Sequence, residues 1–272
     1  MGILLFASYL SIKGAMNLKE LFPLILIILL CQVSSSLFAA DRKKAGEFDY
    51  YVLALSWQPA FCESKPKNPS CRDQHEGQFY ATHFILHGLW PAVKGDKRHT
   101  YKYCHVPKSI LSKKRRWCNM PKLDLSNPVR KRLIPFMPGM VSCLHRHEWY
   151  KHGSCSGLSE NDYYALSNQL VEKFSTTGFS QYVAKQVDQY VSRNMLLRKF
   201  DKEFGKGSRS HLALRCKKID GISLLTEIRI YIRKNISAIN DFGQQIFPEK
   251  KIRIQGNCPR RFKIDEVGVA YK

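Results

Sequence analysis

Residues 48–56 read FDYYVLALS, and this stretch of aromatic and aliphatic side chains predicts a β-strand. Further strands are expected at 82–87 (THFILH), 211–217 and 222–232 (ISLLTEIRIYI). The strand at 82–87 should stop at Gly88, with Pro91 close behind. The strand at 222–232 alternates apolar and polar residues at its end, as a half-buried strand does.

Helices are expected at 126–136, 143–152, 160–174 and 180–190. Asn127 supplies a cap for the first of them, and Pro128 suits its first helical position. Strands and helices are mixed without a regular βαβ rhythm, which favours the α+β class over a doubly wound sheet. No internal repeat or long linker is visible, so we expect residues 41–272 to form a single domain.

The first 40 residues have the pattern of a signal peptide. The apolar run 21–31 follows Lys19, is too short to cross a bilayer, and is followed by small residues. Met16 is an alternative start, the cleavage site is open, and an uncleaved anchor is the competing interpretation. We expect a periplasmic or secreted protein with no stable membrane insertion after the segment is removed.

Charge and composition narrow the class of partner. The chain carries 44 Lys and Arg against 22 Asp and Glu, a formal net charge of +22. With 44% hydrophobic and 12% aromatic residues it is globular, which excludes a disordered basic tail. Nucleic acid, anionic lipid and acidic polymers all fit the charge. The basic runs that could follow a polyanion, or simply be solvated, are 113–116, 130–132, 250–251 and 260–261.

The cysteines indicate disulfides in an oxidising compartment. Of nine cysteines, Cys31 lies in the leader, and an even number remains after it. Eight cysteines allow about 105 pairings, so the count alone fixes none. No CxxC pair occurs anywhere, which argues against the alternative of a zinc site.

Residues 147–153, HEWYKHG, are the densest group of chemically active side chains. We expect them on a short helix with Ser142 as its N-cap and Gly153 as its left-handed end. On such a helix His147 neighbours Lys151, and Glu148 neighbours His152, because residues four apart share a face.

The zinc-protease motif HExxH does not fit this helix. It needs histidines at i and i+4, whereas here the fifth position is Lys151 and the second histidine comes one residue later. Two imidazoles, a carboxylate and an ammonium instead suit proton transfer near neutral pH and an anionic, phosphorane-like transition state. A solvated helix face with i,i+4 ion pairs remains the alternative at this point.

A second group, residues 83–91 (HFILHGLWP), places His87 at the end of an apolar strand and Trp90 just after it. Functional side chains often emerge where a strand ends. An indole face can stack on a base. A buried core histidine and a core tryptophan are the alternative.

Together, HFILHGLWP and HEWYKHGSC (147–155) resemble the two active-site segments of the T2 family of ribonucleases. The opening FDYYVLALSWQPAFC (48–62) and Ser142-Cys143-Leu144 are similar to the bacterial, ribonuclease I-like branch. The likeness continues through LTEIRIYI and Cys258-Pro259, and so covers essentially residues 47–266.

The resemblance implies a metal-independent endoribonuclease that leaves 2′,3′-cyclic phosphate and then 3′-phosphate ends, with no cofactor and RNA as its substrate. His87 and His152 would exchange protons, with His152 favoured as base and His87 as acid, although the sequence does not fix that order. Glu148 and Lys151 would stabilise the pentacovalent phosphorus, His147 would hold a phosphate, and DNA should resist because it lacks the attacking 2′-hydroxyl.

The resemblance also carries expectations about specificity, disulfides and fold. Trp90 would line a base pocket, but Ala92 stands where some relatives carry Asp, and Ser56 where many carry Gln, so we expect low base specificity. The implied fold is a central, mainly antiparallel sheet flanked by helices. The implied disulfides are Cys104–Cys155, Cys216–Cys258, Cys62–Cys71 and Cys118–Cys143.

Two other functions compete with a monomeric ribonuclease. One is a catalytically silent, cationic protein that binds RNA or another polyanion through charge alone. Against it, every polar residue expected of the active site is present. The other is a cationic, membrane-active toxin, but the long amphipathic basic helix that such proteins use is missing from the pattern.

Overall fold

The computed structural model describes residues 44–96, 99–114, 116–236, 239–247 and 256–268, so the expected signal peptide at 1–40 lies outside it. Its strands are β1 (Tyr50–Ser56), β2 (Ile85–Ala92), β3 (Tyr190–Ser192), β4 (Leu212–Ile219), β5 (Ile222–Arg233) and β6 (Arg261–Lys263). Its α-helices are α2 (Gln58–Ser64), α3 (Lys108–Leu111), α4 (Asn127–Phe136), α5 (Leu144–Lys151), α6 (Glu160–Ser175), α7 (Gly178–Ala184) and α8 (Arg193–Phe204).

These strands form one mainly antiparallel sheet, which confirms the expected α+β class. The order is β2-β1-β5-β6-β3. β1 and β6 share one edge of β5, and β4 pairs with its opposite edge. Among the pairs of named strands, only the short contact between β5 and β6 is parallel, and an isolated bridge between Val187 and Ile264 is parallel as well. β5 is long enough to pair with β1 over Glu227–Arg233 and with β6 at Leu224. The centre of the sheet is therefore β1 and β5, with β2 on one edge.

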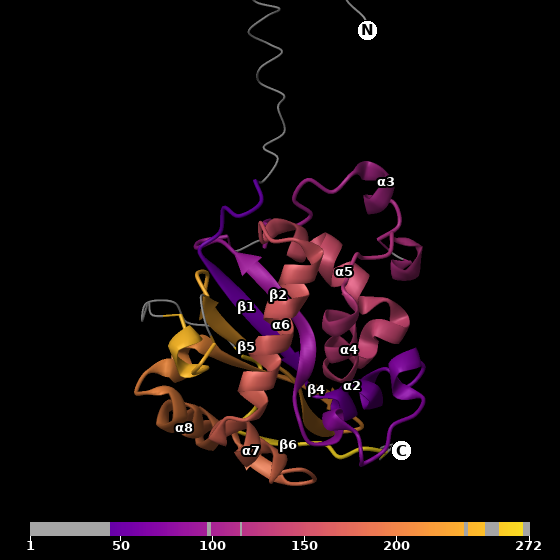
Figure 1. The fold of residues 1–272 in the computed structure, drawn as a ribbon. Coiled ribbons are helices and arrows are strands. Elements are labelled where there is room, and N and C mark those ends of the chain that lie inside the picture. Colours follow the sequence, from indigo (N-terminus) through magenta and orange to yellow (C-terminus); the bar gives the residue numbers. More distant parts are fainter. Residues whose placement is uncertain (1–43, 97–98, 115, 237–238, 248–255, 269–272) are drawn as a thin grey trace, which may run out of the picture. The chain divides into compact units, whose positions relative to one another are not determined.

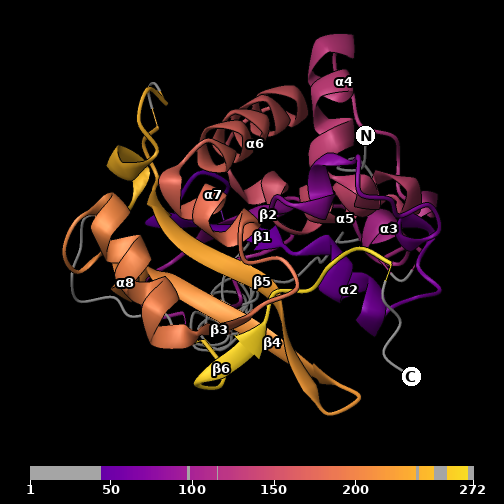
Figure 2. The same cartoon turned by 90° about the horizontal axis from the view of Figure 1, so that it is seen from below.

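Helix α6 lies across one face of the sheet (Figures 1 and 2). Alternate residues of β1 and β5, such as Leu53 and Ile228, point to this face and are fully buried. Tyr163 of α6 packs there, and its hydroxyl accepts from the backbone N–H of Leu89 and donates to the carbonyl of the same residue. Burial of this apolar face is the main stabilisation of the fold, at about 25 cal/mol per Å².

The opposite face of the sheet carries only a small apolar cluster. Tyr50, Val52 and Phe247 form it, with Trp90 and Tyr231 packed against them. Because the strands alternate between the two faces, this face also carries polar and charged residues, among them Glu227 and Arg229 of β5. This is the face on which a site can open.

The predicted range of the second strand, 82–87, is wrong at both ends. β2 begins at Ile85 and continues through Gly88 and Pro91 to Ala92, pairing with β1 along its whole length. Pro91 is tolerated because β2 is the edge of the described sheet, where a missing N–H can face away from the ladder. His87 therefore lies within a strand and not at its end.

The helices agree with the expectation in place but differ at their ends. α4, α5 and α6 fall within one residue of the expected spans, whereas α7 spans Gly178–Ala184 where a helix over 180–190 was expected. Ser126, not Asn127, holds the N-cap position of α4. α2 and α8 were not expected, although Leu196 and Phe200 of α8, four apart and both buried, carry the helical signal.

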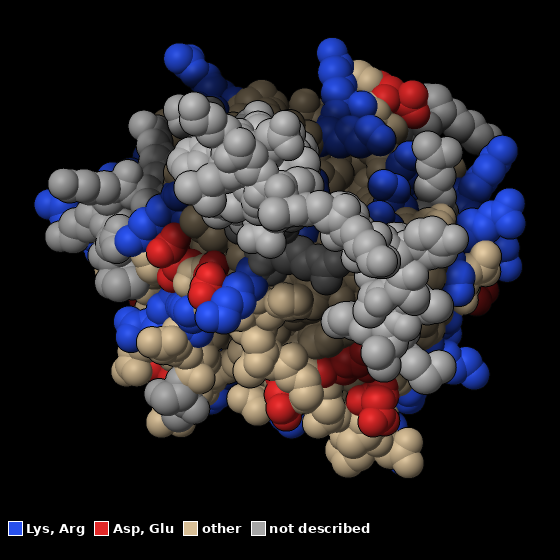
Figure 3. Space-filling view, turned by 90° about the horizontal axis from the view of Figure 1, so that it is seen from above, with Lys and Arg blue, Asp and Glu red and all other residues tan. Residues whose placement is uncertain are grey.

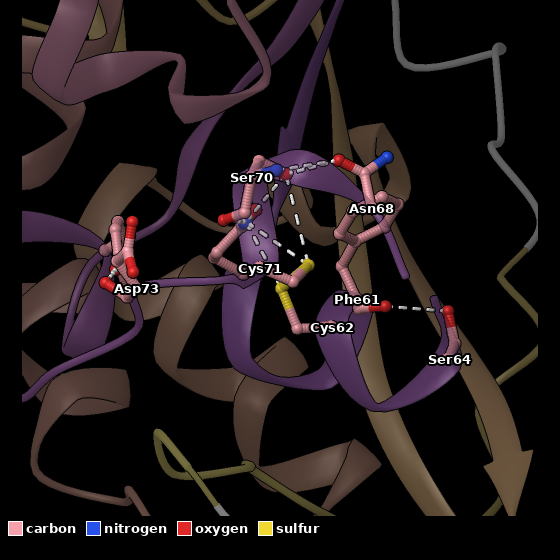
Figure 4. The surroundings of a disulfide bond; sticks show 9 residues. Phe61, Cys62, Ser64, Asn68, Ser70, Cys71 and Asp73 are labelled. Atoms are coloured by element: carbon pink, nitrogen blue, oxygen red, sulfur yellow. Dashed lines mark hydrogen bonds between the residues drawn. A yellow bond between two sulfur atoms is a disulfide. The ribbon is translucent and has the colours of Figure 1, made fainter. Parts of the chain in front are cut away.

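Four disulfides cross-link the domain. They join Cys62–Cys71, Cys104–Cys155, Cys118–Cys143 and Cys216–Cys258, the same pairs that the family resemblance implies. The first closes the loop after α2, where the Asn68 side chain also accepts hydrogen bonds from Ser70 (Figure 4). The second and third tie the long excursion between β2 and α4 to the two ends of α5.

Candidate active site

His87 is aimed by a β-bulge. Ala54 of β1 stands opposite Gly88, and Leu55 stands opposite Leu86, so His87 is the extra residue on β2. A bulge locally turns the strand and re-aims the side chain at that position. The imidazole keeps 33% of its side-chain surface exposed and borders the open face of the sheet.

Helix α5 supplies the other polar groups, but its ends differ from the expectation. Ser142 is not the N-cap; Cys143 takes that position in a left-handed conformation (φ 60°), held by its disulfide to Cys118. The helix ends at Lys151, and His152 follows with φ −121° and ψ −53°. Because His152 has left the helix, its ring is not bound to the i,i+4 spacing from Glu148.

Gly153 is not the left-handed helix end either, since its φ is not positive. It is needed for space, because a Cβ there would overlap the ring of Trp149. The absence of a side chain lets the chain turn directly after His152 and pass close to α5.

Trp90 connects the two histidines. Its indole stacks on His152, with ring centroids 5.1 Å apart and planes at 27°. The edge of His87 meets the same indole at 5.2 Å and 82°. The indole N–H donates to Oε2 of Glu148 at 2.7 Å, which fixes the ring. His87 and His152 therefore lie around one tryptophan at one cleft.

Glu148 is the buried centre of the polar cluster, with 2% of its side chain exposed. Its Oε1 lies 3.7 Å from Nε2 of His87 and 3.9 Å from Nε2 of His147. Burial raises the pKa of this carboxyl, although His87 and the Trp90 N–H favour its charged form.

The two histidines have pKa values shifted in opposite directions. Burial lowers the pKa of His152 well below the usual value, and the charge of Lys151 adds to this. Burial also acts to lower the pKa of His87, but the hydrogen bond with Glu227 and the charge of Glu148 outweigh it, so that pKa is raised. The lowered pKa of His152 favours its neutral form and the raised pKa of His87 favours its charged form, a pairing that suits a proton acceptor and a proton donor.

His147 is less exposed than His87, with 14% of its side-chain surface accessible against 33%. Its ring stacks on Trp117 at 4.5 Å and 23°. Burial and the charge of Lys151 lower the pKa of His147 to about 4. The ring is therefore neutral near pH 7, where it can still donate one N–H to an anionic ligand.

The cleft that these residues border has a volume of about 630 Å³. His87, Trp90, His147, Glu148, Lys151 and His152, the site residues expected from sequence, all line it. A second cavity of about 380 Å³ lies on the other side of His87, between β2, α2 and β4. Arg215, Arg229 and Trp117 border both cavities.

Sequence reasoning missed three residues that contact the site. Glu227 bonds to His87, Arg229 bonds to Glu227, and Trp117 stacks on His147. Glu227 and Arg229 alternate with buried isoleucines on β5, and polar residues on one face of an otherwise apolar strand were the available signal. Trp117 lies in the poorly periodic excursion, where no pattern pointed to it.

Basic residues are spread over the surface. Figure 3 shows Lys and Arg side chains on several sides of one face, with fewer Asp and Glu. Of the basic runs, Arg132 is engaged in an ion pair with Glu172, whereas 250–251 lies outside the described residues. In the described part of the chain, no cluster of three or more His, Cys, Asp or Glu could hold a metal ion. No helix in the same residues is long and apolar enough to span a membrane.

The chain is similar to known ribonucleases. The sequence model of the Ribonuclease T2 family matches residues 48–242. "Ribonuclease I" of Escherichia coli (strain K12) is 32% identical over 268 residues, covering 90% of this chain and 96% of that protein. A "Ribonuclease" of Aeromonas hydrophila is 35% identical over 161 residues, covering 59% of this chain and 61% of that protein. Among solved structures, ribonuclease MC1 from bitter gourd seeds shares the fold, with a TM-score of 0.53 and 18% identity over 80% of this chain and 100% of that one.

Proposed function

The chain belongs to the ribonuclease T2 family, in its bacterial ribonuclease I-like branch, and from that premise we propose that His87 and His152 cleave RNA by transphosphorylation without a metal ion. It is an endoribonuclease of the T2 type. The observation that carries the proposal is that the two imidazoles lie around Trp90 at one cleft with pKa values shifted in opposite directions.

In the proposed reaction His152 takes the proton of the ribose 2′-hydroxyl. The 2′-oxygen attacks the adjacent phosphorus, the bond from phosphorus to the 5′-oxygen breaks, and His87 gives its proton to that leaving oxygen. The products are one strand with a 2′,3′-cyclic phosphate and one with a free 5′-hydroxyl. In a slower second step the roles exchange, and water opens the cyclic ester to a 3′-phosphate.

The pentacovalent intermediate carries extra negative charge on its equatorial oxygens. Lys151 borders the cleft and supplies a positive charge there. Glu148 accepts from the Trp90 indole and lies beside His87 and His147, so we assign it to holding these groups around the intermediate. Neutral His147 can donate its N–H to a phosphate. DNA lacks the 2′-hydroxyl, so it should bind in the cleft without being cut.

Low base specificity is proposed from the cleft lining. Ala92 borders the cleft with a methyl group and has no donor or acceptor for a base edge. The indole of Trp90 is engaged with His152, His87 and Glu148, so its place is set by the catalytic groups. At Ala92 the cleft thus offers a base an apolar contact and no side-chain hydrogen bond, which supports the proposal.

We propose further that residues 1–40 are a signal peptide and that 41–272 are exported as a monomeric enzyme to the periplasm or the medium. The support is the apolar run 21–31 together with the four disulfides, which persist in oxidising compartments.

The test uses a short RNA, excess EDTA and the variants His87→Ala and His152→Ala. Each variant should bind the RNA within about 3-fold of the parent, while cleavage falls about 100- to 10,000-fold, the usual contribution of a general acid or base. The matched control is His83→Ala, a partly exposed histidine of the same segment that stacks on Phe79 outside the cleft. Cleavage that survives both substitutions, or that EDTA abolishes, would contradict the proposal.

A further inference from the structure

Glu227 makes the shortest polar contact to His87 among the described groups. Its Oε2 lies 2.6 Å from Nδ1 of the imidazole, and only 11% of its side chain is exposed. The residue comes from β5, two strands away from β2 in the sheet. Neighbouring strands lie about 4.8 Å apart, so β2 and β5 are separated by two such spacings. Side chains from these two strands can meet only where the local backbone turns them toward each other.

Both β2 and β5 have a β-bulge near this contact. His87 is the extra residue of the β2 bulge, and Thr226, beside Glu227, is the extra residue where β5 pairs with β4. Between them, β1 presents Ser56, which pairs with Glu227. Its small side chain leaves room for the carboxylate and the imidazole to meet above the sheet.

The charge on Glu227 determines which ring nitrogen of His87 is free to exchange a proton with the substrate. Burial acts to raise the pKa of Glu227, but the contact with His87 and the charge of Arg229 outweigh it, so the pKa is lowered. The group is therefore a carboxylate and only accepts hydrogen bonds. His87 must donate through Nδ1, which leaves Nε2, the nitrogen that lies 3.7 Å from Glu148, to exchange protons.

Glu227 is itself held in place. Its other oxygen, Oε1, accepts from Nε of Arg229 at 2.6 Å. The guanidinium of Arg229 lies 4.9 Å from the ring of Trp90, and that indole meets the edge of His87. His87, Glu227, Arg229 and Trp90 thus form a closed ring of contacts, in which no member can turn without disturbing another.

We propose that Glu227 is a positioning residue, which holds His87 with Nε2 toward the leaving 5′-oxygen, and that Arg229 orients Glu227. This inference rests on the proposed role of His87 as the general acid. Both oxygens of Glu227 contact protein groups, His87 and Arg229, so Glu227 acts through His87 and not by binding RNA.

The first test compares two substrates whose leaving groups differ in their need for a proton. In a dinucleotide the 5′-oxygen needs a proton to leave, whereas 4-nitrophenolate leaves uridine 3′-(4-nitrophenyl phosphate) without one. Glu227→Gln should lower kcat on the dinucleotide about 10-fold, and Glu227→Ala should lower it about 100-fold. Both losses fall within the ~100- to 10,000-fold rate acceleration that a general acid contributes. KM should change little, and both variants should retain the aryl substrate within about 3-fold. Equal losses on the two substrates would overturn the proposal.

The second test is a double-mutant cycle with His87→Ala. If Glu227 acts only through His87, adding Glu227→Gln to His87→Ala should change dinucleotide cleavage by less than 2-fold. Independent, multiplying losses would overturn the proposal. Should His87→Ala itself fail to discriminate between the two substrates, the assigned role of His87 is what fails, so the two ideas are distinguishable.

The third test is the pH profile. The charged groups around His87 are Glu227 and Arg229 from β5, Glu148 from α5 and Arg215 from β4, with His147 and His152 nearby. Removing the negative charge of Glu227 lowers the pKa of His87, so the alkaline limb of kcat/KM on the dinucleotide should move to lower pH. Glu172→Gln, which alters the exposed ion pair with Arg132, is the matched control and should move neither limb. Equal thermal unfolding of the Gln variants shows that they fold, and an unmoved alkaline limb in folded Glu227→Gln would overturn the proposal.

Discussion

Gly88 and Leu89 lie between His87 and Trp90, and the hydrogen bond from Trp90 to Glu148 passes close to the Cα of Gly88. A Cβ at this position would overlap both Oε2 of Glu148 and Nε1 of Trp90. The glycine of this segment is therefore required by the site and not by backbone conformation, since its φ is not positive.

Gly88→Ala should lower kcat about 100-fold, the loss expected when catalytic groups are displaced by about 1 Å. The methyl group must push the indole or the Glu148 carboxylate aside. Steady-state kinetics on a dinucleotide and thermal unfolding check this. Gly77→Ala is the control, since its Cβ would make only an ordinary contact, 3.6 Å from His75. An active Gly88→Ala variant would contradict the packing described here.

The pH dependence follows from the two shifted histidines. In the proposed mechanism activity needs His152 neutral and His87 protonated. The lowered pKa of His152 keeps it neutral down to a pH below the usual value of about 6.5, and the raised pKa of His87 keeps it protonated above that value. A plot of kcat/KM against pH should show a plateau around pH 6.5 that falls on the acid side through His152 and on the alkaline side through His87. A sharp, narrow bell centred there would contradict the assignment.

At the scale of elements, the excursion between β2 and α4 covers the site. Its Trp117 stacks on His147, and the neighbouring Cys118 is bonded to Cys143 at the start of α5. The excursion is thus fixed to α5, the helix that carries the proposed phosphate-binding groups.

Trp117→Ala should raise KM about 2- to 10-fold, as expected from losing a stacked pair worth about 0.5–1.5 kcal/mol. Exposing His147 should also raise its pKa from about 4 toward the usual 6.5, because burial is the main cause of the shift. NMR titration of the ring protons measures the second effect. Trp117→Phe keeps a stacking ring and should show little of either change.

The sequence allowed much of the site to be predicted, because two contiguous segments hold most of it. His87, Trp90, Glu148 and His152 needed no knowledge of the sheet. Glu227 could not be assigned in this way, since its contact with His87 depends on two bulges and a strand order that local patterns do not encode. The early end predicted for β2, at Gly88 before Pro91, was wrong for the same reason. Only the edge position of β2 makes a proline acceptable within the strand.

At the scale of the whole molecule, the positive charge should govern RNA binding. Lys102, Lys151, Arg215 and Arg229 border the cleft. With about four phosphate contacts on single-stranded RNA, binding to His152→Ala should weaken about 50-fold between roughly 50 and 200 mM salt. Adding Lys102→Ala should reduce the logarithmic slope by about 0.7. Lys199→Ala, over Tyr182 and outside the cleft lining, should leave it unchanged. A salt-independent affinity would contradict electrostatic binding.

The disulfides should contribute unequally to stability. Cys104–Cys155 spans 51 residues, and Cys62–Cys71 spans 9. In the chain-entropy description, removing the first by paired Cys→Ala substitution should lower the free energy of unfolding by about 4 kcal/mol, and removing the second by about 2.6 kcal/mol. Urea unfolding measures both values. A larger loss from the short loop would show that native-state contacts, not loop closure, set the difference.

³¹P NMR of a dinucleotide digest in excess EDTA follows the chemistry proposed for His87 and His152. A 2′,3′-cyclic phosphate resonance should appear first, and a 3′-phosphomonoester should replace it later. A 5′-phosphate, or a 3′-phosphate that forms without the cyclic intermediate, would contradict this chemistry.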